Sequence, residues 1–451
     1  MLGGLGPNGL MALLSVIVFG ASVILLWRPG ESPILLFTFV YPWLQASAAI
    51  FHANWLGIPL ADYSQVGGDT ELAASLTLIG LLCLAAGMRL GAGGWDWRTG
   101  EQTRAMALAH PVSDWFKLYF QYALASAAIM IGGSQIAPGL MQVLLGISAL
   151  RWAFFYLLAY ASFLRPAASR QFLYGAFAFE LLTSIGGFFS DFKTVFFFLL
   201  MALLASQLRP TARASVGIAV VAAMALSLGV VWTAVKNEYR AYVSGGASAQ
   251  IVAVDASAQW SKLAELAQRL DGAALANGAD QLIRRLSYTE FFGVVLERVP
   301  QMVPHEDGAI WFDALIRPFT PRMFFPWKTE IDDSMRTYIF TGGLTRPREG
   351  TSISLGYVAE SYIDFRMFGM MACLALFGYA LGRTYKILLS WRRSRGALGM
   401  ALASAAIFGA TFLEASITKT LGGFVGSLLA AWLICRWGVP KWCPWVVDDR
   451  A

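Results

Sequence analysis

Apolar segments of about 20 residues recur along this chain and constrain its fold more than any other feature. A helix needs roughly 20 apolar residues to cross the hydrocarbon core of a bilayer. Hydrophobic residues make up 57% of the sequence and charged residues only 14%, which is typical of a membrane protein. We therefore predict an all-α polytopic membrane protein with about 11 transmembrane helices. The predicted spans are 9–27, 33–52, 71–89, 114–131, 138–163, 171–189, 192–208, 214–235, 366–388, 399–415 and 419–436.

The arginines between these spans indicate how the chain is oriented. Connections rich in basic residues alternate with connections that have few or none, and the basic ones face the cytoplasm in membrane proteins. The N-terminus is therefore predicted outside and the C-terminal tail inside. Because the chain lacks the basic start of a cleaved signal peptide, its beginning is interpreted as the first span. The basic connections hold Arg28; Arg89, Arg98 and Arg104; Arg165 and Arg170; Arg209 and Arg213; Arg392, Arg393 and Arg395.

One long polar segment, residues 236–365, interrupts the apolar chain. Apolar residues recur at helical spacing in 254–272 and 279–299, which predicts two amphipathic helices lying on the membrane or over the spans. After Pro300 the frequent Pro and Gly residues predict irregular structure that ends in a short helix. The predicted regions are a membrane region at 1–235, an extracytoplasmic loop at 236–365, and a membrane region with a cytoplasmic tail at 366–451.

The end of this loop, Arg317–Gly369, has an unusual composition. Its basic residues are interleaved with acids, prolines, glycines and aromatic residues. Such a stretch is too polar to cross a bilayer and too aromatic to be a flexible linker. We interpret it as an ordered, largely extramembrane surface that binds an anionic group beside the membrane. The basic residues are Arg317, Arg322, Lys328, Arg336, Arg346, Arg348 and Arg366.

No pattern in the sequence indicates a cofactor or a metal ion. None of the four cysteines lies in the polar loop, and Asp332 and Asp333 lack further ligands at metal-binding spacing. A P-loop, a dinucleotide fingerprint and a nucleophile elbow are also missing, so neither nucleotides nor nucleic acid are expected partners. Two charges lie well inside predicted spans, Arg151 and Glu180. We predict that they form an ion pair, with proton-coupled transport as the alternative.

Several short motifs resemble the Wzy-type oligosaccharide repeat-unit polymerases, which build O-antigen, enterobacterial common antigen and exopolysaccharides. The family has a Pro-Arg-x-x-x-Pro-x-Lys-Pro-like segment in its large outer loop, followed by a Thr/Ser-Gly-Glu-x-Tyr-x-Phe-Gly re-entry. This chain departs from the first segment at Thr329, where a second proline is usual. The matching motifs are Pro321–Lys328; Thr351–Ser354 with Gly356, Glu360, Tyr362, Phe368 and Gly369; Ser190–Lys193; and Asn237–Arg240.

The resemblance implies a glycan polymerase of the bacterial inner membrane. Such enzymes join repeat units carried on undecaprenyl pyrophosphate at the periplasmic face, without a metal or other cofactor. The implied partners are the lipid-linked oligosaccharide, membrane lipids, a chain-length regulator and a repeat-unit flippase. Two further functions share parts of this reading, an O-antigen ligase that transfers glycan to a lipid A core and a flippase or transporter of lipid-linked oligosaccharides. A non-catalytic scaffold of a polysaccharide assembly complex is the third alternative.

This reaction requires cations for the departing pyrophosphate and a base for the acceptor hydroxyl. Glu360 is the first candidate for the base, and His305, the only histidine of the loop, is the second. Each cation also has a simpler explanation as the partner of a nearby acid or lipid headgroup, and Glu360 as the partner of Arg366. The candidate ligands of the pyrophosphate and glycan are Lys193, Arg240, Arg284, Arg285, Arg317, Arg322, Lys328, Arg346, Arg348 and Lys419.

Overall fold

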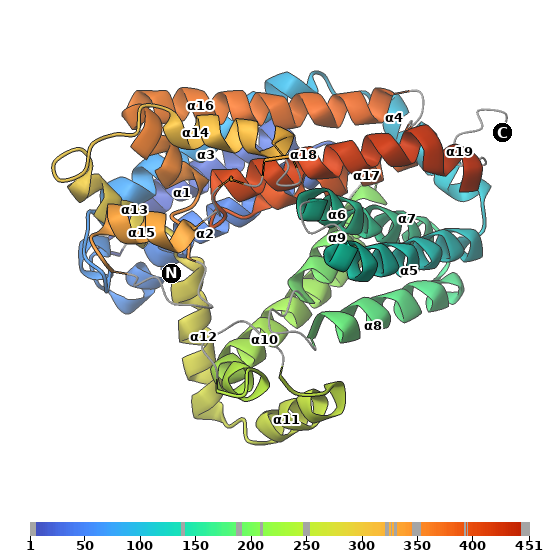
Figure 1. The fold of residues 1–451 in the computed structure, drawn as a ribbon, viewed down its shortest axis with the longest axis horizontal. Coiled ribbons are helices and arrows are strands. Elements are labelled where there is room, and N and C mark those ends of the chain that lie inside the picture. The colour runs from blue at the N-terminus through green and yellow to red at the C-terminus, as the bar shows by residue number, and fades with distance from the viewer. Residues whose placement is uncertain are drawn as a thin grey trace.

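The computed structural model of this protein is built from helices, and every regular element among its described residues is helical. This confirms the predicted all-α class (Figure 1). The structure describes residues 6–136, 140–185, 192–207, 211–246, 253–320, 324–325, 327–328, 332–344, 353–391, 394 and 396–442.

The α-helices are α1 (Gly9–Leu26), α2 (Ile34–Leu56), α3 (Thr70–Ala92), α4 (Trp97–Ala109), α5 (Val112–Ile136), α6 (Met141–Ala149), α7 (Arg151–Phe163), α8 (Gln171–Ile185), α9 (Phe192–Ala205), α10 (Ala212–Val243), α11 (Ala256–Gln268), α12 (Gly272–Leu286), α13 (Thr289–Arg298), α14 (Ala309–Ile316), α15 (Asp333–Thr341), α16 (Tyr357–Ser390), α17 (Ala397–Ile407), α18 (Ile417–Leu433) and α19 (Val439–Trp442). Short helical turns are η2 (Leu60–Asp62), η4 (Ala167–Arg170), η5 (Arg317–Phe319), η6 (Phe408–Thr411) and η7 (Ile434–Gly438).

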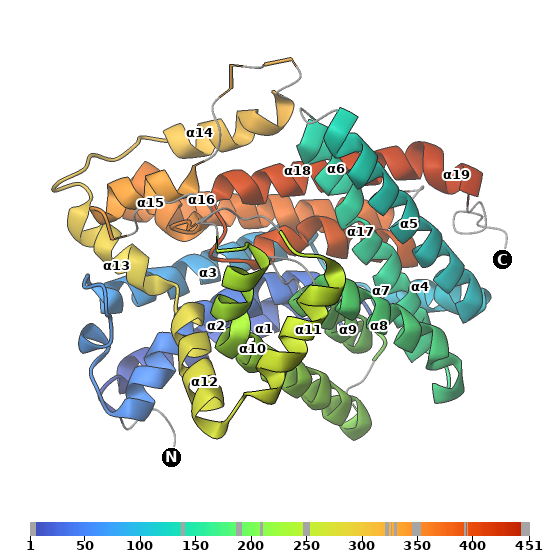
Figure 2. The same cartoon turned by 60° about the horizontal axis from the view of Figure 1, so that its bottom comes forward.

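Each predicted span overlaps a helix of the structure. In the described part of the chain, seven helical segments are long and apolar enough to cross a membrane. They are Gly9–Leu26, Ile34–Leu56, Thr70–Ala92, Val143–Phe163, Ser215–Val243, Tyr357–Ser390 and Ile417–Lys441. Phe192–Ala205 and Ala397–Thr411 are apolar but shorter. The chain therefore has the construction of a membrane protein, with most of its long helices lying side by side (Figures 1 and 2).

Helices α3 and α16 approach each other most closely, through glycines on both sides. A Cβ atom added at Gly378 would overlap the carbonyl oxygen of Leu84, and one added at Gly382 would overlap that of Met88. Gly87 and Gly91 face α16 in the same way. Pairs of glycines four residues apart let helix backbones touch within membranes. These glycines join α16, which follows the polar segment, to α3 among the N-terminal helices.

Arg151 and Glu180 form the ion pair that their positions predict. The guanidinium Nη2 lies 3.6 Å from the Glu180 carboxylate, whose side chain is fully buried. Tyr119 donates a hydrogen bond of 2.9 Å to that carboxylate. The pair joins α7 to α8, and Tyr119 adds α5 to the contact.

The polar segment contains more helices than the two amphipathic ones predicted. The apolar side of α11 packs on α10, where Leu266 contacts the cluster formed by Val235, Tyr239 and Val243. The prediction of one helix over 279–299 is wrong, because α12 ends at Leu286 and α13 begins at Thr289. Figure 2 shows α10, α11 and α12 lying together at one side of the molecule.

The break between α12 and α13 has a tertiary cause. The Tyr288 N–H donates to the backbone carbonyl of Gln45 in α2, and the Tyr288 hydroxyl donates to the carbonyl of Ser354. A continuous helix would use that N–H within itself, so the contact with α2 fixes the chain in a bend.

The prediction of irregular structure after Pro300 is also wrong, since α14 and α15 form there. The short helix predicted at the end of the loop is present but continues into the following span as α16. Its geometry breaks at Arg366, which has a φ of 61° and a ψ of −174°. A bulky residue rarely adopts a positive φ, and here it separates residues 357–365 from the rest of α16.

Candidate functional site

The candidate site is built around the turn between η6 and α18, residues 412–416, which ends beside the middle of α2. Gln45 is preceded by eleven residues of α2 and followed by eleven more, so it is the central residue of that helix. Its amide oxygen accepts the Leu413 N–H at 3.0 Å, and its amide nitrogen donates to Glu414 at 2.6 Å. Because α2 is long enough to cross a membrane, this turn lies in the interior of the bundle.

Parts of the polar segment enter the bundle to the same level. Tyr288 contacts the backbone of Gln45, as described above. Gly356, at a φ of 84°, lies so close to the Leu413 carbonyl that a Cβ atom would overlap it. Glycine is the residue that tolerates both that φ and that approach. The membrane helices and the polar segment therefore meet here, and we call this junction the recess.

Glu360 lies at the base of this recess with both carboxylate oxygens bonded. Arg336 Nη1 donates to one oxygen at 2.7 Å, and the backbone N–H of Ile417 donates to the other at 2.6 Å. Ile417 is the first residue of α18, whose N-terminal dipole favours a negative charge. Burial opposes the charge of Arg336, but the adjacent Glu360 carboxylate outweighs it and raises the pKa of the guanidinium. The Glu360 carboxylate therefore favours the charged form of Arg336.

A second buried acid, Asp333, lies on the same face of α15 as Arg336. Asp333, three residues before Arg336, is 1% exposed and pairs with Lys419 Nζ at 2.7 Å. Residues three apart share a helix face, so α15 presents one acid and one base together to the first turn of α18. The Lys419 side chain remains 46% exposed. Its ammonium can therefore be reached from the recess.

Glu414 and Lys193 form a looser pair at the other side of the turn. Their charged atoms are 3.7 Å apart, and the side chains are 31% and 42% exposed. The Lys193 ammonium also lies 4.3 Å from the centre of the Phe412 ring. An accessible carboxylate and an accessible ammonium therefore stand beside each other in the recess.

Further cations lie near the recess. Arg285 of α12 lies within electrostatic range of Tyr41 in α2, and also of Arg240 and Lys236 at the end of α10. Like charges repel at such separations, so the group favours an added anion. This second group lies on helices that carry no part of the Glu360 pair.

Of the predicted pyrophosphate ligands, Lys193, Lys419, Arg240 and Arg285 therefore have positions in or around the recess, while others have local partners. Arg284 donates to Asp280 at 2.9 Å, and Arg317 donates to Asp313 at 2.8 Å. Lys328 donates to two backbone carbonyls near the end of α14. Arg322, Arg346 and Arg348 lie outside the described residues.

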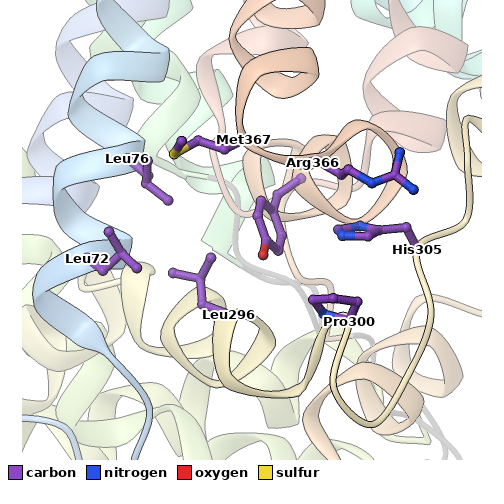
Figure 3. Close-up of a pocket in the computed structure, with 8 residues that line it drawn as sticks. Leu72, Leu76, Leu296, Pro300, His305, Arg366 and Met367 are labelled. Atoms are coloured by element: carbon purple, nitrogen blue, oxygen red, sulfur yellow. The ribbon is translucent and has the colours of Figure 1, made fainter.

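The second candidate base, His305, lies at a different site. It lines a cavity of about 500 Å³ together with Leu72, Leu76, Leu296 and other mainly apolar residues (Figure 3). Its Nδ1 donates to the carbonyl of Ile363 at 3.0 Å. The predicted pairing of Glu360 with Arg366 is wrong, because Glu360 binds Arg336. Arg366 instead lies 3.2 Å from Asp307.

Glu414, Gln45 and Arg336 were not predicted to share a site. The available signal was a carboxylate in Glu414 between two apolar runs, the same signal that identified Glu180. Among the described residues, no group of three or more His, Cys, Asp or Glu side chains is placed to hold a metal ion. The recess is therefore a site of ion pairs, tyrosines and amides.

Comparisons with known proteins give one match. No curated protein and no solved structure matches the chain. The family described as "Domain of unknown function (DUF8712)" matches residues 101–413, which include Lys193, Arg336 and Glu360 and end one residue before Glu414. This match covers more than half of the sequence, and the chain therefore belongs to the DUF8712 family.

Proposed function

We propose that this protein is a membrane glycosyltransferase that joins oligosaccharide repeat units carried on undecaprenyl pyrophosphate. The observation that carries the proposal is the recess itself, where accessible lysines and an accessible carboxylate lie together inside an apolar bundle. A lipid-linked sugar pyrophosphate combines an apolar chain, an anionic leaving group and a hydroxyl-bearing glycan. A site between lipid and water that offers cations and a base suits all three parts.

Lys193 and Lys419 are the proposed ligands of the pyrophosphate. Each ammonium is held near a carboxylate and is still exposed on one side. Fixed cations in a water-poor recess stabilise the charge that develops as the pyrophosphate leaves, without the reorganisation that free water requires. Arg240 and Arg285 extend the positive potential towards the end of α10 and help to attract the anionic donor.

Glu414 is the proposed base, in place of Glu360. Glu360 is 1% exposed and has both oxygens bonded, so its role is to hold α15 against α18. Glu414 is 31% exposed and has one oxygen whose charged neighbour is 3.7 Å away. In the proposed step, the acceptor hydroxyl oxygen bonds to the anomeric carbon of the donor. Its proton passes to Glu414, and the pyrophosphate leaves with the bonding electron pair.

Replacement of Glu414 tests this function. In a strain that lacks the protein, lipid-linked single repeat units should accumulate while long chains disappear, as seen by glycan gel analysis. Glu414→Gln should keep donor binding and slow chain extension by about 10²–10⁴-fold, because a positioned base contributes that much. Glu297→Gln, which changes an exposed acid of α13, is the matched control and should extend chains normally.

Three outcomes would contradict different parts of the proposal. Wild-type extension by Glu414→Gln would remove that residue from the reaction but leave the polymerase proposal intact. Long chains that stay on the lipid carrier in the deletion strain, with an unmodified lipid A core, would identify a ligase. Unchanged glycans in the deletion strain would exclude both reactions.

We propose about 11 spans in a bacterial inner membrane, with the polar segment on the periplasmic side. This orientation predicts which of two exposed positions can be labelled from outside. Trp55 at the end of α2 and Ser390 at the end of α16 are both exposed. In spheroplasts, an impermeant thiol reagent should label Trp55→Cys but label Ser390→Cys only after the membrane is opened. Equal labelling of both would overturn the orientation. The background variant replaces Cys83, Cys373, Cys435 and Cys443 by alanine.

A further inference from the structure

The surface of α14 and the residues that follow it is unusually apolar for a segment between polar stretches. Six large hydrophobic side chains there are between 41% and 76% exposed. They are Phe312, Leu315, Ile316, Phe319, Phe324 and Trp327. Phe312, Leu315, Ile316 and Phe319 recur at helical spacing on α14 and η5, and such an exposed apolar face indicates contact with a membrane or another apolar surface.

The position of α14 beside the spanning helices decides between these surfaces. The Trp311 ring packs edge-on against Phe377 of α16, with the ring centres 5.9 Å apart. Phe377 is eleven residues beyond the break at Arg366, which corresponds to about 16 Å along a helix. The hydrocarbon core is about 30 Å thick. With Arg366, the predicted start of the span, at the edge of the core, α14 reaches roughly half of that depth. Figures 1 and 2 both show α14 lying alongside α16 and α18.

Several contacts fix α14 at this level. Asp364 accepts the backbone N–H groups of Ile310 and Trp311, at 3.2 and 2.8 Å, and so neutralises the N-terminus of the helix. Trp311 Nε1 donates to the Ser361 hydroxyl at 3.0 Å. Both partners belong to residues 357–365, which fold back at Arg366 and bring Tyr357 against Phe377 as well.

Among the described residues of this segment, the charged side chains of Arg317 and Lys328 are bonded within it. Arg317 is bonded to Asp313 one turn earlier at 2.8 Å. Lys328 donates to the carbonyls of Arg317 and Thr320, at 2.6 and 2.8 Å, where the helix ends and its carbonyls lack helical partners. Backbone at membrane depth must have its polar groups satisfied by protein, because lipid chains offer no hydrogen bonds.

We infer that α14 and η5, with Phe324 and Trp327, form a re-entrant insertion whose exposed apolar face contacts the hydrocarbon chains of the bilayer. For these residues, the inference replaces the expectation that the 236–365 loop lies outside the membrane, and it is independent of the proposed reaction. Lipid is the occupant because α16 is itself apolar and exposed beside this segment, as at Leu376, which is 70% exposed. The insertion enters from the end of the bundle that carries the polar segment.

Spin labels at Phe312→Cys and Phe319→Cys, in the cysteine-free protein reconstituted in phospholipid vesicles, test this inference. Both labels should be accessible to oxygen and protected from a water-soluble nickel chelate, as a label at Leu376→Cys should be. A label at Glu306→Cys, three residues before α14, should show the opposite preference. All these positions are exposed, so substitution leaves the packing of the helices unchanged.

Two results would overturn the inference. Labels at Phe312 and Phe319 that prefer the nickel chelate, as at Glu306, would place the segment in water. Labels that are immobile and protected from both reagents would show that protein, either a second copy or another partner, covers the face.

Discussion

Gly378→Leu should prevent the protein from accumulating in folded form, which is the largest effect on folding that we expect from a single substitution. An added Cβ overlaps the carbonyl oxygen of Leu84, and that oxygen belongs to backbone that no rotamer change can move. Overfilling a packed site typically costs about 1–3 kcal/mol, and more where backbone must separate. The helices that would separate, α3 and α16, join the two ends of the chain. Size-exclusion profiles of the detergent-extracted protein measure the effect.

Gly20→Leu is the matched control for this prediction. Gly20 also lies within an apolar helix, α1, but an added Cβ there meets no atom within 4 Å. The control variant should therefore elute and accumulate like the wild type. A Gly378→Leu protein that elutes normally would show that α3 and α16 are not in backbone contact.

Hydropathy found the helices but not how they pair. It measures the cost of placing a segment in lipid, and a helix lies over each predicted span for that reason. Glycines enter such an average as nearly neutral residues, so the close approach of Gly87 to Ala375 and of Gly378 to Leu84 left no trace in it. The ion pair of Arg151 and Glu180 was predictable because two isolated charges in adjacent spans have few other partners.

The polar segment was harder to predict because tertiary contacts decide its local structure. Tyr288 ends a helix by bonding to α2, which lies more than 200 residues earlier in the sequence. The partner of Glu360 was assigned by closeness in sequence to Arg366, but the positive φ at Arg366 separates the two sides of that helix. Arg336, which makes the actual pair, lies on a different helix.

The candidate site was also hard to predict, because tertiary contacts bring its residues together. Charge counts singled out the cations near Arg317, whereas Arg317 pairs with Asp313 and Lys328 donates to carbonyls at a helix end. Lys193 and Lys419 were predicted as ligands from their places at span ends. Their common site depends on the Gln45–Glu414 contact, which joins residues 369 apart. No sequence pattern at short range contains that contact.

Arg336→Met should destabilise the protein by about 3–5 kcal/mol, because it leaves a buried carboxylate without its partner. Glu360 is 1% exposed and would keep only the Ile417 N–H. The helix α15 would lose its contact with the recess, so Lys419 would also lose the position that Asp333 gives it. Thermal unfolding in detergent and chain extension should both reveal the loss. Arg366→Met, which breaks an exposed pair with Asp307, is the matched control and should change stability by about 0–1 kcal/mol.

The double variant Arg336→Met with Glu360→Met separates the ion pair from the packing around it. Replacing both members of a buried pair by apolar residues of similar size is often neutral or stabilising, whereas removing one is not. We therefore expect the double variant to recover most of the stability that Arg336→Met loses. Its thermal stability, combined with those of the two single variants, gives the coupling between the residues. If Glu414 is the base, the double variant should also recover some chain extension, because the reacting carboxylate remains. A stable double variant without any extension would return the catalytic role to Glu360.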